Sequence, residues 1–156
     1  MLRRFVYQWI LASLCLFILH GNAIAAGEHG SGDEATAMVK KAVAMVKEKG
    51  KDAFLAAVPD AKGPFIDRDL YLSVYDFNGV VLAHGVNPKL VGKNVITLND
   101  SDGKLFIKDI VQQAKAAGKG HEDYKWPNPQ TKEYQAKTVY FEVVDNIIIS
   151  CGFYKY

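Results

Sequence analysis

The amino-acid sequence predicts an α+β fold, with a five-stranded antiparallel sheet, a long N-terminal helix on one face and ligand-pocket loops on the other. Three observations support this prediction. A helical pattern comes first, strand patterns then follow in groups, and short turn signals join neighbouring strands. Strands that are joined by short turns pair in the antiparallel sense. A sheet that loops cover on one face provides a common setting for a small-molecule pocket.

Residues 1–25 are predicted to be a secretory signal peptide. Arg3 and Arg4 form a basic start, residues 5–19 are mostly apolar, and Ala23-Ile24-Ala25 matches a small-residue cleavage site. The apolar stretch is shorter than the roughly 20 residues that span a bilayer. Cleavage after Ala25 predicts a periplasmic or secreted protein. The alternative is an anchor formed by an uncleaved N-terminal segment.

The composition of residues 26–156 argues against several classes of partner. The whole chain has a formal charge of +2, and removal of Arg3 and Arg4 brings this charge to zero. A neutral chain without a basic run predicts neither nucleic-acid binding nor a polybasic membrane patch. One cysteine, Cys151, is left after cleavage, so no disulfide within the chain is expected. Cys151 lies in an apolar stretch and is expected to be buried.

Residues 26–33 are predicted to be a flexible leader, followed by one domain over residues 34–156. This domain begins with an amphipathic helix over residues 34–50, where apolar side chains recur at spacings of three to four with lysines between them. Ser31 followed by Glu34 fits a capping box. The helix is therefore predicted to begin directly after the leader, at Glu34.

The apolar period then changes to two. After a short predicted helix over residues 52–58, residues 69–76 alternate apolar with aromatic or polar side chains, as in a strand with two different faces. Asn78-Gly79 is a hairpin turn signal, and residues 80–84 form the returning strand.

The second half of the chain has a helix followed by strands. An amphipathic helix is expected over residues 104–118 and ends at glycines. Asp145-Asn146 is a turn signal between the last two strands. The three strand candidates are residues 121–126, 136–144 and 146–155.

Five stretches, in this order and at these separations, carry a family resemblance. They are residues 70–94, 98–111, 118–129, 137–141 and 150–156. Together they resemble single Cache domains of the sCache_2 type, the extracytoplasmic PAS-like sensor modules of chemoreceptors and histidine kinases. The resemblance covers the chain from about Asp33 to Tyr156. It implies a PAS-like fold and a small organic acid as ligand, such as acetate, propionate, lactate or pyruvate.

Two interpretations of His84 remain open. Simple alternation places it at the end of the apolar face formed by Val80 and Leu82. It could hydrogen-bond a carbonyl of the loop over residues 86–93. The resemblance instead implies a donor to a bound carboxylate, a task that suits histidine because neutral imidazole donates and imidazolium binds an anion more strongly.

Lys137 is the stronger candidate. It shares a strand face with Val139 and Phe141, and a lysine on such a face is rarely buried without a partner. It either reaches solvent at the strand end or pairs with a carboxylate ligand. The resemblance favours the ligand and also implies a role for Tyr140. Alternation places Tyr140 on the opposite face, so either a bulge intervenes or only one of the two lines the pocket.

Four further aromatic side chains are candidates for the pocket wall. An aromatic ring with one polar atom offers a small acid both an apolar wall and a hydrogen bond. Packing of the sheet is the alternative for each of them. The four residues are Tyr71, Tyr75, Tyr124 and Trp126.

The remaining motifs do not predict a metal, a cofactor or catalysis. Residues 99–103 are rich in carboxylates, but an EF-hand alignment places Leu98 and Asp109 at ligand positions that require other residues. Helix capping by Asp100 or Asp102 explains them better. No histidine cluster suits zinc, no haem-attachment motif occurs, and no nucleophile motif or carboxylate pair indicates an enzyme.

The sequence therefore predicts an exported sensor-type binding domain for a small organic acid, which reports to a membrane signalling partner. The first helix could also form a homodimer contact. The alternative is an interaction module that docks on a receptor or kinase without binding a ligand. A pocket filled by its own side chains would favour that alternative.

Overall fold

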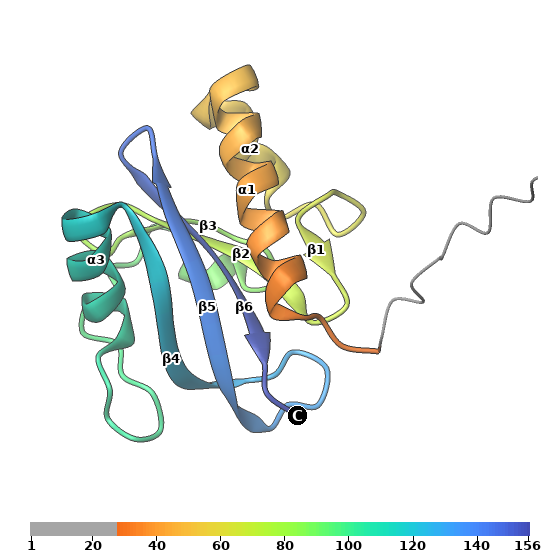
Figure 1. Cartoon of the computed structure of the whole chain (residues 1–156), viewed down its shortest axis with the longest axis vertical. Helices are drawn as coiled ribbons and strands as arrows, with labels where there is room; N and C mark the ends of the chain where they lie inside the picture. The colour runs from red at the N-terminus through yellow and green to blue at the C-terminus, as the bar shows by residue number, and fades with distance from the viewer. Residues whose placement is uncertain (1–27) are drawn as a thin grey trace, which may run out of the picture.

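The computed structural model describes residues 28–156, so the predicted signal peptide lies outside the described residues (Figure 1). Helix α1 begins at Gly32, close to the predicted start. No helix within residues 28–156 is long and apolar enough to cross a membrane. The elements, in chain order, are α1 (Gly32–Lys49), α2 (Lys51–Ala57), β1 (Ile66–Asp67), β2 (Leu70–Tyr75), β3 (Val81–His84), the 3-10 helix η1 (Pro88–Leu90), α3 (Phe106–Ala117), β4 (Lys119–Pro127), β5 (Tyr134–Val144) and β6 (Ile147–Tyr154).

The strands form one antiparallel sheet in the order β1-β2-β6-β5-β4, with β3 also paired to β2. The last strand of the chain thus lies in the middle, between the first hairpin and β5 (Figure 1). The α+β prediction with an antiparallel sheet is confirmed. The two-residue strand β1 was not predicted, because two residues carry no readable alternation.

The predicted capping box starts α1. The Ser31 hydroxyl accepts a hydrogen bond from the Glu34 amide at 3.3 Å, and the Ser31 amide donates to the Glu34 carboxylate at 2.7 Å. The buried face of α1 packs on β5 and β6. Its buried residues are Ala35, Met38, Val39, Ala42, Val43 and Val46.

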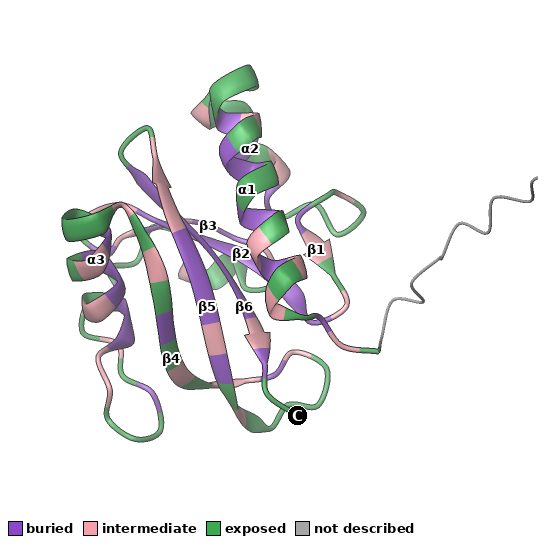
Figure 2. Cartoon of the chain, viewed as in Figure 1, coloured by how far each residue is buried: buried purple, intermediate pink, exposed green. Residues whose placement is uncertain are grey.

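The other face of the sheet is covered by α3 as well as by loops. Phe106, Ile107 and Ile110 of α3 pack with Phe141 and Ile148 of the sheet. Sequence reasoning assigned this cover to loops alone, because the apolar stripe of α3 does not indicate which face it meets. Figure 2 shows buried residues on α1, on α3 and along β5 between them.

The predicted hairpins differ in regularity. Asp145 and Asn146 both have positive φ, 47° and 58°, so the β5–β6 turn is the tight turn that their residue types indicate. The β2–β3 connection contains Gly79 at φ 80°, but the pairing shifts register between Val74 and Tyr75. Strand β3 therefore contains an irregularity that simple alternation does not anticipate.

Candidate ligand-binding site

A small cavity lies on the α3 side of the sheet, where β2, β3 and β4 face η1 and α3. Its volume is about 20 Å³, which is room for little more than one water molecule. We call it the inner cavity. Its lining residues are Tyr71, Ser73, Tyr75, Val81, His84, Leu90, Val95, Leu98, Phe106, Ile107, Tyr124 and Trp126.

A larger and more open depression, the outer cleft, adjoins the inner cavity and has a volume of about 490 Å³. It shares four lining residues with the inner cavity: Tyr71, His84, Leu90 and Trp126. Its remaining residues come from the loop after β3, from Pro127 at the end of β4 and from the loop between β4 and β5. The outer cleft therefore provides a path from solvent to the inner cavity, past Leu90 and Trp126.

The Lys137 side chain, on β5, is buried, with 2% of its surface exposed. Tyr124 on β4 and Tyr154 on β6 are its register partners. The missing side chain of Gly152 makes this position possible, since a Cβ there would lie 2.2 Å from Lys137 Cε. Burial lowers the pKa of Lys137 from 10.5 to about 7.

Two phenols surround the Lys137 amine. Nζ donates to the Tyr71 hydroxyl at 2.8 Å and to the Tyr154 hydroxyl at 3.3 Å, and it lies 4.0 Å from the centre of the Tyr71 ring. Lys137 does not itself line the inner cavity, whereas Tyr71 does. Tyr71 thus connects the buried amine to the inner cavity.

The hydroxyl groups in this cluster have defined roles. The Tyr154 hydroxyl donates to the Pro127 carbonyl at 2.9 Å. Tyr71 accepts from Lys137 and has its own proton to donate, either to Tyr154 at 3.4 Å or to a molecule in the inner cavity. Burial raises the pKa of Tyr154 to about 12 and that of Tyr71 well above its ordinary value. Both phenols therefore remain donors at neutral pH.

His84 is buried and neutral. Its Nδ1 accepts hydrogen bonds from the amides of Val86 at 3.3 Å and Asn87 at 3.1 Å. Burial, with a smaller effect of Lys137, lowers its pKa to about 4. The loop contact that sequence reasoning considered is present, but the loop supplies amide donors rather than a carbonyl acceptor. Since Nδ1 accepts, the proton sits on Nε2, which can donate to a molecule in the inner cavity.

The bulge in β3 changes which side chains accompany His84. Sequence alternation placed Leu82 on the face of His84, and this is wrong: Leu82 packs with the α1-side core, whereas Val81 lines the inner cavity. The His84 ring stacks on Tyr71, with ring centres 5.2 Å apart. His84, Tyr71 and Lys137 therefore form one continuous group.

The other aromatic candidates form the wall and the floor of the inner cavity. Tyr124 stacks on Phe106 with ring centres 4.0 Å apart, and Trp126 meets Phe106 edge-on at 5.3 Å. These contacts hold the start of α3 against β4. Tyr75 is buried at the opposite side of the cavity, from β2. These residues therefore line the inner cavity and also pack against neighbouring side chains of the fold.

Tyr140 lies apart from the other six candidates. It packs in the core on the α1 side of the sheet, and its hydroxyl donates to Glu142 at 2.9 Å. Strand alternation holds through β5 without a bulge, since Lys137 to Val144 pair in register with β6. Tyr140 and Lys137 therefore point to opposite faces, and Tyr140 does not line the inner cavity.

Sequence reasoning missed Tyr154 and the α3 side chains Phe106 and Ile107. Tyr154 could have been found by placing the β5–β6 turn at Asp145-Asn146 and counting outward, because that register sets Tyr154 opposite Lys137. Contact of Phe106 and Ile107 with the cavity depends on how α3 docks, which no local pattern reveals.

The carboxylates of residues 99–103 organise a loop rather than a helix cap. Asp100 accepts amide hydrogen bonds from Asp102, Lys104 and Lys125, and so ties this loop to β4. The N-cap of α3 is Leu105, without a side-chain hydrogen bond, so the predicted helix capping by Asp100 or Asp102 is wrong. Within residues 28–156, no group of His, Cys, Asp and Glu side chains is arranged to hold a metal ion.

The fold belongs to the Cache and PAS-like class of sensor domains. A methyl-accepting chemotaxis protein from Vibrio parahaemolyticus superimposes with a TM-score of 0.67 at 22% identity, over 78% of this chain and 86% of that chain. A structure described as the basis for carboxylic acid recognition by a Cache chemosensory domain gives 0.62 at 24% identity, over 78% and 86%. At these identities the likeness shows the fold alone.

Sequence comparison identifies the family. The family model of single Cache domain 2 matches residues 21–155, so the chain belongs to this family of extracytoplasmic sensor domains. It is 31% identical over 77 residues to the methyl-accepting chemotaxis protein McpP of Pseudomonas putida, and 32% identical over 89 residues to the sensor histidine kinase MctS of Rhizobium johnstonii. The matches cover 49% and 56% of this chain, but only 14% and 19% of those two proteins.

Proposed function

We propose that the chain binds a small monocarboxylate in the inner cavity and is the ligand-binding part of a signalling system. The observation that carries this proposal is the buried amine of Lys137. Its hydrogen-bond partners are two neutral phenols, and no carboxylate within residues 28–156 forms an ion pair with it. Asp69 acts on the amine only through longer-range attraction. A buried cation without a directly paired anion is unfavourable, so an anion beside it has a strong electrostatic reason to bind.

The polar groups around the inner cavity suit a carboxylate. The proton of Tyr71 and the Nε2 proton of His84 are both donors on its wall, and Lys137 lies directly behind Tyr71. A carboxylate that accepts from these donors gains charge-assisted hydrogen bonds. The rest of the lining is apolar and aromatic, which favours a short hydrocarbon substituent over a second charge.

The size of the inner cavity indicates a small ligand and some movement on binding. A volume of about 20 Å³ holds little more than a water molecule, so even a two-carbon acid requires Leu90 or Trp126 to move outward. Both side chains also line the outer cleft, into which they would move. We therefore propose acids of two to four carbon atoms, in line with the carboxylic acid named for the related Cache structure.

We also propose a membrane-bound receptor or kinase as the partner that reads the occupied state. The relatives that match in sequence are a chemoreceptor and a sensor histidine kinase. Export to the periplasm or to the medium follows if residues 1–25 act as a cleaved signal. A homodimer through α1 remains a proposal, and the exposed lysines Lys40, Lys41 and Lys47 would have to be accommodated in it.

A second function is favoured by the same small volume. A cavity so nearly filled by Tyr71, Trp126 and their neighbours is also what a docking module without a ligand would show. In that case Lys137 would serve only to order the phenols of Tyr71 and Tyr154.

A thermal-shift screen separates the two functions. The melting temperature of the purified protein is measured with acetate, propionate, lactate or pyruvate. The Lys137→Met variant is measured in parallel with the same acids. A ligand that binds the folded state raises the melting temperature with concentration. A shift for one or two acids that disappears in Lys137→Met supports the binding function. No shift across the panel for a folded protein supports the docking module.

A further inference from the structure

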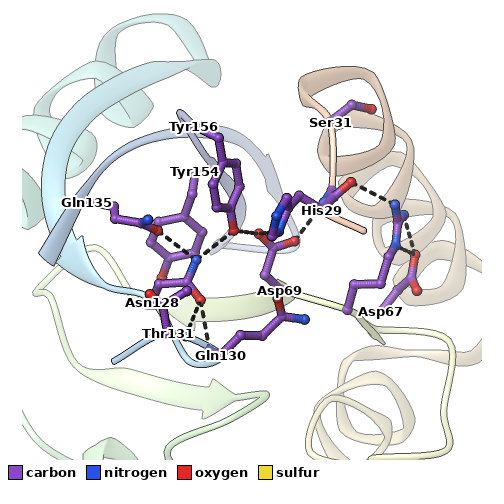
Figure 3. Close-up of polar contacts among 12 residues, drawn as sticks. His29, Ser31, Asp67, Asp69, Asn128, Gln130, Thr131, Gln135, Tyr154 and Tyr156 are labelled. Atoms are coloured by element: carbon purple, nitrogen blue, oxygen red, sulfur yellow. Dashed lines mark hydrogen bonds and ion pairs between the residues drawn. The ribbon is translucent and has the colours of Figure 1, made fainter. Parts of the chain in front are cut away.

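A buried aspartate joins the two ends of the described chain on the side of the sheet edge formed by β1. Asp69 has no exposed surface. Its Oδ1 accepts from the Gly30 amide at 2.7 Å, and its Oδ2 accepts from the Tyr156 hydroxyl at 2.7 Å. Figure 3 shows Asp69 between the segment that leads into α1 and the segment that follows β6.

His29 lies beside this aspartate without a hydrogen bond of its own at Nδ1. The His29 ring stacks on Tyr156 with ring centres 3.6 Å apart, and its Nδ1 lies 3.8 Å from Asp69 Oδ2. Within residues 28–156, Nδ1 of His29 is the one buried side-chain polar atom that lacks a partner. A buried polar atom without a partner is costly, so a small movement that brings it to Asp69 would be favourable. Oδ2 of Asp69 thus accepts from Tyr156, and Nδ1 of His29, when it carries the proton, is a second donor 3.8 Å away.

The contact between Tyr156 and Asp69 leads on to the ligand site. The Tyr156 hydroxyl accepts from Asn128 Nδ2 at 2.7 Å, and Asn128 is fully buried in the β4–β5 loop (Figure 3). Pro127, the last residue of β4 and the chain neighbour of Asn128, accepts from the Tyr154 hydroxyl, which in turn accepts from Lys137. Every link from the amine of Lys137 to Asp69 is therefore a hydrogen bond or a neighbouring residue in the chain.

The His29 side leads to the first turn of α1. Arg68 donates to the His29 carbonyl at 2.8 Å and pairs with Glu34 at 2.6 Å. Glu34 is the residue that closes the capping box with Ser31. Packing is tight here as well, because a Cβ on Gly30 would lie 2.2 Å from the Leu70 side chain. Movement of His29 would therefore displace the residues at which α1 begins.

We propose that Asp69 is a relay with two states, which couples the ligand site to the start of α1. In the empty protein Oδ2 accepts from Tyr156. When a carboxylate occupies the inner cavity, the amine of Lys137 turns to it and leaves its longer contact with Tyr154, the β4–β5 loop shifts, and Oδ2 accepts from His29 instead. This inference rests on the proposed binding of an acid, and it assigns the regulatory output to the entrance of α1.

The two states predict opposite effects of two substitutions on the affinity for the acid. Tyr156→Phe removes the donor that holds the empty state, so it should tighten binding of the acid. His29→Phe keeps the stacking ring but removes the donor that holds the occupied state, so it should weaken binding. Coupling between sites is reciprocal, and shifts of about fivefold are typical of it. Tyr134→Phe is the matched control, because Tyr134 is 64% exposed on β5.

The test measures the affinity of the purified protein and these variants for acetate, propionate, lactate and pyruvate by calorimetry. The relay predicts about fivefold tighter binding for Tyr156→Phe, about fivefold weaker binding for His29→Phe and no change for Tyr134→Phe. Equal affinities for wild type, Tyr156→Phe and His29→Phe would overturn the relay.

A second measurement needs no ligand and so separates failure of the relay from failure of the proposed function. Tyr154→Phe cuts the link between Lys137 and Pro127 without touching His29 or Asp69. The relay predicts that this change alters the 15N shifts of the His29 ring and of the Gly30 amide. Unchanged 15N shifts would overturn the relay even if an acid binds to the protein. Altered 15N shifts would support the relay even if none of the four acids binds.

Discussion

The amine of Lys137 lies 2.8 Å from the hydroxyl oxygen of Tyr71, in the interior of the protein and without a carboxylate partner in the described chain. Tyr71 lines the inner cavity, so the amine of Lys137 lies directly behind the wall of that cavity. A charge in this position is unfavourable in the empty protein and favourable beside an anion.

Lys137→Met should weaken binding of a monocarboxylate at least about tenfold, or 1.4 kcal/mol, because the charge is lost while the side-chain volume is kept. The same change should leave the stability of the empty protein unchanged or raise it, since an uncompensated buried charge is removed. Calorimetric titration and thermal unfolding check the two effects. Lys119→Met is the control, because it removes the charge of an exposed lysine on β4. Unchanged affinity in Lys137→Met would remove Lys137 from the site.

Binding of a monocarboxylate should weaken about tenfold as the pH rises from 6 to 8. The pKa of Lys137 in the empty protein is about 7, and the protonated amine is the form that holds an anion. Binding is therefore at full strength below pH 7 and declines above it, until the higher pKa of the complex is reached. The pKa of His84, about 4, lies outside this range, so His84 should not contribute. Calorimetry at several pH values should show a flat profile for Lys137→Met.

His84→Asn should reduce the sensitivity of the protein to acid. The folded-state pKa of His84 is lowered from 6.5 to about 4, so the unfolded chain takes up a proton first as the pH falls. The contribution of His84 to the free energy of unfolding is roughly 3 kcal/mol above pH 6.5, and this contribution is lost as the pH falls to 4. Asparagine retains an acceptor for the loop amides but does not titrate.

The measurement for His84→Asn is urea unfolding between pH 7 and pH 4. The difference in the free energy of unfolding between the wild type and His84→Asn should shrink as the pH falls. A constant difference would show that His84 is protonated in the folded protein or that the loop amides do not bind it. His84→Asn should also weaken binding of the acid, because the Nε2 donor is lost.

Gly152→Ala should disturb Lys137 selectively. A Cβ at this position would lie 2.2 Å from Lys137 Cε and 2.7 Å from Val139 Cγ1, and so would displace the lysine. We expect a loss of stability of about 1–3 kcal/mol and a loss of acid binding. In a Lys137→Ala background the stability loss should be smaller, because the clash with Cε is gone. Equal losses in both backgrounds, measured by chemical unfolding, would contradict the packing described for Lys137.

The fold could be predicted from the sequence because its signals are local. The lysine-spaced pattern of α1, the alternation in β2 and the turn at Asp145-Asn146 each depend on neighbouring residues. Alternation alone also separated Tyr71, Ser73 and Tyr75 from Leu70, Leu72 and Val74, as the structure confirms.

The candidate site was only partly predictable, because it depends on contacts between distant segments. The bulge in β3 moved Val81 rather than Leu82 to the inner cavity, and docking of α3 brought Phe106 to Tyr124. The direction of the His84 hydrogen bonds depends on where the loop amides lie, which alternation does not encode. Tyr156 and Asp69 are 87 residues apart in the sequence, and no pattern links them.

The most direct test of the central claim is an NMR titration of the Lys137 side chain, followed through its Cε resonance with and without saturating propionate or acetate. We expect a pKa near 7 for Lys137 in the empty protein, and a clear rise when the acid binds. A pKa that is the same with and without a bound acid would mean that the anion does not sit beside this amine, and the proposed site would be wrong.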